Sequence, residues 1–243
     1  PIAMLSVSAA VLVLFALMWW LLSRSFLKIA TASGKTEKKV YKETAVRQKG
    51  VSGALLAKEF KRFTASPNYM LNCGLGILLL FVCGILLLIK GAEMISVLNA
   101  LFDGSAGSIP VLLCTAICLI ACMNDMAAPS VSLEGKTLWL AQSLPITPWQ
   151  VLRAKLSVQL LLTGVPVLFC ILCTAFIYPY TLPELLLTVL VPLSFTVLSA
   201  LFDLFLGLKL VNLSWTSEIT PIKQSASAAV ALLSGFAYAV LLC

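Results

Sequence analysis

The sequence predicts an all-α membrane protein, a bundle of about six transmembrane helices, and two observations favour this class. Of its 243 residues, 60% are hydrophobic and only 11% are charged, whereas a soluble domain carries roughly 25% charged residues. The apolar residues also gather in runs of about 20, the length that a helix needs to cross the hydrocarbon core of a bilayer. Membrane β-strands need only about ten residues and alternate in polarity, so helices fit these runs better.

The apolar runs and the charges between them predict one transmembrane domain over residues 1–243. The predicted spans are 2–22, 70–89, 109–128, 156–177, 184–206 and 225–243. Of the 17 Lys and Arg, all except Lys90 fall in the loops 23–69, 129–155 and 207–224. Basic residues in short loops stay on the cytoplasmic side, so these three loops are predicted to be cytoplasmic. Because Pro1 opens directly into an apolar run, we expect this chain to be a piece of a longer protein.

Composition excludes several classes of function. The net charge of +7 lies in loops that flank apolar runs, so it predicts attraction to membrane lipids and not to nucleic acid. The chain has no histidine, which excludes His-dependent zinc hydrolases and Ser-His or Cys-His nucleophile pairs. It also has no G-x-x-x-x-G-K-[ST] loop, so it cannot split ATP by that mechanism. Its 8 cysteines all lie in or beside apolar runs and are expected to be free structural thiols. We predict no catalytic, cofactor-binding or metal-binding residue.

The first two predicted cytoplasmic loops both contain patterns that predict helices. Residues 51–63, VSGALLAKEFKRF, place apolar and basic residues on opposite faces of a helix. This helix either lies passively among lipid headgroups or forms an elbow that also presents a surface to a partner protein. In the second loop, Ser132 is expected to cap a short helix that ends before Pro145, and Thr147-Pro148 to begin the next one. The alternative for this second loop is an ordinary re-entry turn.

Three stretches of the cytoplasmic loops together resemble one known family. They read KEFKRFTASPNYMLN, SLEGKTLWLAQSLPITPWQVLRAKL and NLSWTSEITPIKQS. In this order between membrane spans, they are similar to the permease subunit of bacterial ABC-2-type exporters, and in particular to the large permeases of Firmicutes. The middle stretch carries most of the resemblance, with its Glu134-Gly135-Lys136 step, Trp139, the Ser143-Leu144-Pro145 step and Lys155. Members of that family are usually longer, which again implies a fragment.

The resemblance implies a non-enzymatic, multi-pass permease subunit in the bacterial plasma membrane. A separate cytoplasmic ABC ATPase would bind and hydrolyse the ATP, so the chain itself would hold no cofactor. A second permease half or copy would complete the pathway for an unidentified substrate. Carried onto this sequence, the candidate residues for docking the ATPase are Glu134, Lys136, Trp139 and Leu144, followed by Lys58, Glu59 and Arg62.

Two acidic residues near the inner ends of predicted spans leave an alternative open. Asp125 and Asp203 fall within spans three and five, and ionisable residues in a bilayer are candidates for function. They either form the relay of an ion-coupled secondary transporter or serve only to pair helices near cytoplasmic water. A non-catalytic membrane scaffold and a membrane-embedded enzyme are the remaining alternatives.

Overall fold

A computed structural model of the chain describes residues 2–30, 50–101 and 108–241, and within these ranges it contains helices and no strand. The predicted all-α fold is therefore confirmed. The elements are α1 (Ile2–Ala30), α2 (Val51–Ala65), α3 (Pro67–Cys73), α4 (Leu75–Leu101), α5 (Ser108–Ala121), α6 (Ala127–Ser130), the 3-10 helix η1 (Ser132–Thr137), α7 (Leu138–Ser143), α8 (Pro148–Ile177), α9 (Leu182–Lys209), α10 (Ile219–Lys223) and α11 (Ala226–Leu241).

The chain divides into two compact units, residues 1–47 and 48–243. Helix α1 belongs to the first unit, and every later element belongs to the second. The lysine-rich part of the first predicted cytoplasmic loop, residues 31–49, lies outside the described residues. The functional argument below therefore concerns the second unit alone.

Four helical segments are long and apolar enough to cross a membrane, by length and composition: 75–100, 148–177, 182–209 and 219–241. The predicted spans 2–22 and 109–128 correspond to shorter apolar helical runs in the described residues, Val11–Ser25 and Ser108–Ala121. The chain is thus a helical membrane protein, and the total of six spans stays a prediction.

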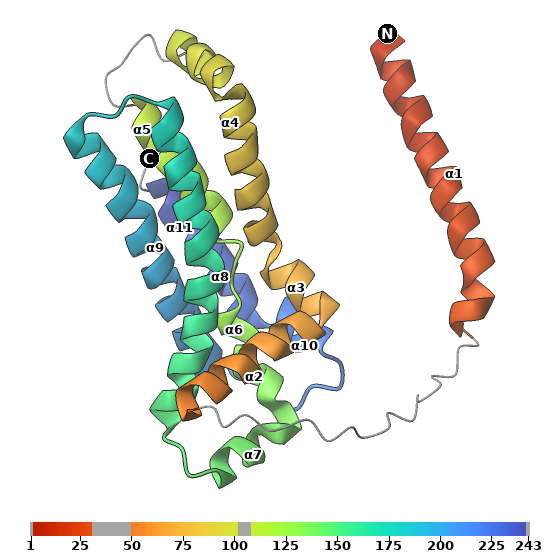
Figure 1. The fold of residues 1–243 in the computed structure, drawn as a ribbon. Helices are drawn as coiled ribbons and strands as arrows, with labels where there is room; N and C mark the ends of the chain where they lie inside the picture. The colour runs from red at the N-terminus through yellow and green to blue at the C-terminus, as the bar shows by residue number, and fades with distance from the viewer. Residues whose placement is uncertain (1, 31–49, 102–107, 242–243) are drawn as a thin grey trace. The chain divides into compact units, whose positions relative to one another are not determined.

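Helix α8 lies at the centre of the second unit. It packs against α4, α9 and α2, while α5 and α11 pack against α9. The core between these helices includes the buried side chains of Leu80, Cys118, Val167, Cys170 and Phe195. Short helices α2, α3, α7 and α10 gather at one end of the unit (Figure 1). α2, α7 and α10 come from the loops predicted to be cytoplasmic, and α3 begins in the first of these loops and continues into the span predicted over 70–89. The packing therefore brings these loops together.

The third predicted span is interrupted. A continuous span was expected over 109–128, but α5 ends at Ala121 and helix resumes only at Ala127. Gln159 of α8 stabilises the gap: its side-chain oxygen accepts the Ala127 N–H at 2.7 Å, and its amide nitrogen donates to the Asn124 carbonyl at 2.9 Å. A break at membrane depth is tolerated where neighbouring side chains satisfy the freed backbone groups.

We predict that Gly207→Ala destabilises the bundle, because a Cβ at this position of α9 would overlap the carbonyl oxygen of Ala128 in α6. Overpacking of this kind costs about 1–3 kcal/mol. The matched control is Gly164→Ala in α8, where a Cβ would meet no atom within 4 Å. Thermal unfolding in detergent should show a lower melting temperature for Gly207→Ala alone. Equal behaviour of the two variants would contradict the close packing of α6 on α9.

Candidate functional site

Five charged side chains join α2, η1 and α8, and we call them the charge cluster: Lys58, Glu59, Arg62, Glu134 and Lys155. Lys155 Nζ donates to Glu134 Oε1 at 2.8 Å and to Glu59 Oε2 at 3.0 Å. From α2, Arg62 Nη2 donates to Glu134 Oε2 at 3.0 Å and Lys58 Nζ donates to Glu134 Oε1 at 3.2 Å. One carboxylate in the second predicted loop thus binds cations from the first loop and from a long apolar helix.

The centre of the charge cluster is removed from solvent. The side chains of Lys155 and Glu134 are each 2% exposed, and that of Glu59 is 6% exposed. Lys155 also donates to the carbonyl oxygen of Ser130 at 3.0 Å, so all three ammonium protons have acceptors. Burial of charge is tolerated only when the ions are paired and hydrogen-bonded. Lys155 and Glu134 meet that condition through the convergence of all three elements, whereas Glu59 Oε1 and Arg62 Nη1 are buried with ion-pair contacts alone.

Glu134 and Arg62 hold each other in the charged state. Burial alone would raise the pKa of Glu134, but the hydrogen bond from Arg62 and the positive charge of Lys155 hold that pKa well below its ordinary value of 4.5. Burial alone would lower the pKa of Arg62, yet the Glu134 hydrogen bond and the negative charge of Glu59 raise it. Glu134 and Arg62 therefore stay ionised through the neutral and mildly acidic range.

The third predicted cytoplasmic loop is fastened to the same place. Trp215 Nε1 donates to the Ser132 carbonyl at 2.6 Å, and the Asn212 backbone N–H donates to the Ser132 hydroxyl oxygen at 3.0 Å. Ser66, which lies between α2 and α3, donates to Glu218 Oε2 at 3.0 Å. All three predicted cytoplasmic loops therefore meet in one assembly around η1.

Gly135 has a specific reason to be glycine. Its φ of +46° lies in the left-handed region that residues with a Cβ rarely adopt. A Cβ at this position would also lie 3.0 Å from Cζ2 of the Trp215 indole ring. The Glu134-Gly135-Lys136 step therefore lets the chain turn sharply beneath Trp215 immediately after the carboxylate of the charge cluster.

Some local predictions are confirmed and others are wrong. The amphipathic helix predicted over 51–63 is α2, and Thr147 forms a capping box with Gln150 at the start of α8. Ser132 does not cap a helix: Val131 precedes η1 in a helical conformation, so the chain enters η1 from an existing turn.

The predicted ATPase-docking residues separate into buried and exposed groups. Glu134 and Glu59 lie inside the charge cluster, where Arg62 and Lys58 are 22% and 38% exposed. Trp139 and Leu144 are 64% and 48% exposed. The side chain of Lys136 lies outside the described part of the structure. Among the predicted docking residues that the structure describes, Trp139 and Leu144 are thus the two that expose large apolar side chains.

Helix α7 contributes no buried residue. Together with Trp139 and Leu144, its Leu140 is also exposed, at 48%, and we call these three residues the α7 patch. The patch follows η1 directly in the sequence and precedes the capped start of α8. A partner that binds it contacts the segment that links the charge cluster to a long apolar helix.

The two intramembrane acidic candidates are both buried, at 7% exposure for Asp125 and 4% for Asp203. Gln159 Nε2 donates to Asp203 Oδ2 at 2.6 Å and thereby joins α9 to the gap between α5 and α6. Among the described residues, neither acid forms an ion pair with Lys or Arg, and no group of three potential metal ligands occurs. Sequence reasoning missed Gln159, although it is an isolated amide in an apolar run, four residues after Lys155.

No family model, curated protein or solved structure matches this chain. The resemblance to ABC-2-type permeases therefore stays a prediction, and the geometry of the three loops has to support any function on its own.

We predict that Glu134→Gln lowers the free energy of unfolding by about 3–5 kcal/mol, because it leaves the buried Lys155 with an incomplete set of counter-charges. The matched control is Glu93→Gln, which breaks an exposed pair with Lys90 whose side chains are 79% and 73% exposed. An exposed pair contributes about 0–1 kcal/mol. Equilibrium unfolding in detergent measures both variants. A loss no larger for Glu134→Gln than for the control would show that the cluster contributes little to stability.

The stabilisation by Glu134 should also depend on pH. Its pKa is lower in the folded chain than its ordinary value of 4.5, so its contribution is fully present above that value and is lost as the pH falls toward the folded-state pKa. The difference in unfolding free energy between the wild type and Glu134→Gln should be constant above about pH 5 and should shrink below it. A difference that grows on acidification would contradict this assignment.

Proposed function

We propose that this chain is a transmembrane permease subunit of an ABC-2-type exporter in the bacterial plasma membrane. A separate cytoplasmic ATPase hydrolyses ATP and so drives an unidentified substrate across the membrane, and a second permease half or copy completes the pathway. The observation that carries the proposal is the assembly of all three predicted cytoplasmic loops around η1, with the α7 patch exposed beside it. The family resemblance of these same loops adds to that support.

The assembly supplies a connection from the surface to several long helices. α7 is linked through η1 and Glu134 to Lys155 in α8 and to Arg62 in α2. Trp215, from the loop that leads to α10 and α11, bonds to η1 as well. A displacement of α7 by a partner therefore reaches the spans that contain α8 and α11 as a movement of joined parts. Transitions between discrete packing arrangements are driven in this way.

The α7 patch has the chemistry of a protein-docking surface. Exposed Trp and large aliphatic side chains dominate the binding energy of many interfaces, and an apolar patch left in water marks a contact site. On this proposal Trp139, Leu140 and Leu144 contact the ATPase, while Glu134 and Glu59 keep the patch in position from inside the charge cluster.

The gap between α5 and α6 supports a second candidate, an ion-coupled secondary transporter. Interrupted helices with nearby polar groups line the substrate and ion sites of such transporters, and Asp125 lies within this gap. Asp203 is joined to the same region through Gln159. This candidate requires that Asp203→Asn abolish proton- or sodium-driven flux in vesicles that contain no ATPase. Unchanged flux in that variant would remove it.

We predict that Trp139→Ala combined with Leu144→Ala abolishes co-purification with the proposed cytoplasmic ABC ATPase and abolishes ATP-dependent transport. The melting temperature should stay unchanged, because α7 buries no side chain. Trp149→Ala is the matched control, since Trp149 is 68% exposed but lies in the first turn of α8 outside the α7 patch.

Intact association and transport in the double variant would show that docking occurs elsewhere. A wild-type chain that binds no ATPase and moves solute without nucleotide would overturn the proposed exporter function itself.

A further inference from the structure

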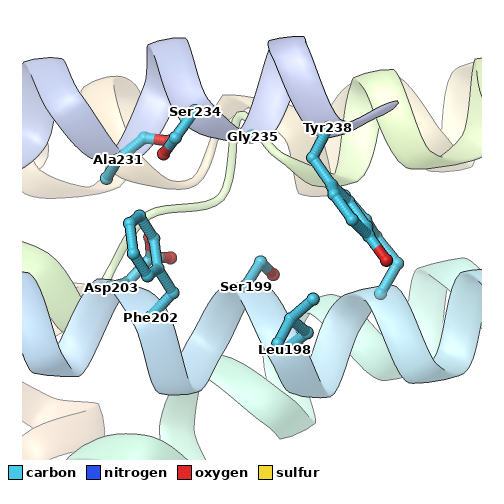
Figure 2. Close-up of a pocket in the computed structure, with 9 residues that line it drawn as sticks. Leu198, Ser199, Phe202, Asp203, Ala231, Ser234, Gly235 and Tyr238 are labelled. Atoms are coloured by element: carbon cyan, nitrogen blue, oxygen red, sulfur yellow. The ribbon is translucent and has the colours of Figure 1, made fainter. Parts of the chain in front are cut away.

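A pocket of about 240 Å³ lies between α9 and α11, apart from the charge cluster. Its lining includes Phe195, Ser199, Phe202, Asp203, Ser234 and Tyr238. In Figure 2 the side chains of Ser199 and Phe202 rise from α9 into the space below α11, and Tyr238 extends down from α11 on the other side. The pocket therefore has mostly apolar walls with a few polar groups, as ligand sites in proteins do.

Asp203 brings a carboxylate with unused capacity to this pocket. The residue is 4% exposed, and Gln159 binds only its Oδ2 atom. Within the described residues, Oδ1 accepts no hydrogen bond and neither oxygen has a Lys or Arg partner. Among the described residues no Lys or Arg therefore supplies a positive charge to Asp203, and a buried carboxylate without a counter-charge is costly.

The two serine hydroxyls of the pocket also act as acceptors, whereas the Tyr238 hydroxyl can donate or accept. The Ser199 hydroxyl donates its proton to the Thr196 carbonyl at 3.2 Å, and the Ser234 hydroxyl donates to the Val230 carbonyl at 2.6 Å. Each oxygen is therefore left with lone pairs and no free proton. A ligand that binds between Asp203 and these two serines has to donate hydrogen bonds.

Aromatic rings complete the pocket. Phe195 and Tyr238, which both line the pocket, stack on each other with their ring centroids 5.7 Å apart and an angle of 14° between the ring planes. Phe202 is 39% exposed beside Asp203. Phe202 thus lies next to the carboxylate, and the Phe195–Tyr238 pair lies farther along the pocket. An aromatic ring beside a carboxylate suits an organic cation, since ring quadrupoles attract positive charge.

We propose that this pocket binds an amphipathic organic ammonium ion, whose charged nitrogen donates to Asp203 and whose apolar part lies against Phe195, Phe202 and Tyr238. A volume of about 240 Å³ holds the ammonium group and one ring or short chain. The binding itself does not depend on an ATPase. The further statement that such an amine is the exported substrate rests on the proposed function.

The test uses the full chain in phosphatidylcholine nanodiscs, which carry no net charge, with 4-phenylbutylamine and the uncharged 4-phenylbutanol as probes. Saturation-transfer NMR titration measures each dissociation constant. The wild type should bind the amine about tenfold or more tightly than the alcohol, as a hydrogen bond to a charged group predicts. Asp203→Asn should remove this preference. Asp125→Asn, which changes a similarly buried acid outside the pocket lining, should retain it.

Equal binding of the two probes, a preference that survives Asp203→Asn, or signal that matches empty nanodiscs would overturn the proposal. If Asp203→Asn fails to fold, Ser234→Leu provides the second test, because it narrows the pocket and leaves the carboxylate in place. Amine binding must then weaken, and unchanged binding in folded Ser234→Leu would also overturn it. Specific amine binding without ATP-dependent transport would contradict the proposed exporter function and leave this site intact.

Discussion

The position of the Lys155 ammonium group constrains the rest of this structure. The group is 2% exposed near the start of a long apolar helix, so it requires carboxylates that α8 does not supply. Glu59 lies 96 positions away in sequence and Glu134 lies 21 positions away. Satisfying one cation therefore requires that α2 and η1 both pack onto α8. Once η1 is in place, Ser132 is available to the third loop through Trp215 and Asn212.

Helix α8 also holds other helices in place one turn after Lys155. Lys155, Gln159 and Thr163 follow at intervals of four, so they share one face of α8, and all three are buried. Lys155 joins the cytoplasmic loops, and Gln159 joins Asp203 of α9 to the gap between α5 and α6. Two of the three polar side chains on this face thus fix the positions of elements that apolar packing alone would leave free to slide.

Sequence patterns within one segment predicted local structure well, but they did not predict the contacts between segments. The apolar runs predicted the long helices, the apolar and charged faces of residues 51–63 predicted α2, and Thr147-Pro148 predicted the start of α8. No periodicity in a single segment reveals that Lys155 binds Glu59 and Glu134. The gap after Ala121 was missed for the same reason, because its backbone groups are satisfied by Gln159 from another helix. Ser132 was misassigned because its partners lie about 80 residues later.

The contrast between the buried charge cluster and the exposed α7 patch bears on the proposed mechanism. Replacing a buried ion cluster by well-packed apolar residues is often neutral or stabilising, so stability alone does not explain why this cluster is charged. Hydrogen bonds from Lys155 and Arg62 to Glu134 have defined lengths and directions, whereas apolar contacts tolerate sliding. If the charge cluster transmits a movement of α7 to α8, its residues have to keep the same partners while the helices move. Directional ion pairs satisfy this requirement, and the α7 patch stays available because none of its side chains is needed to hold the charge cluster together.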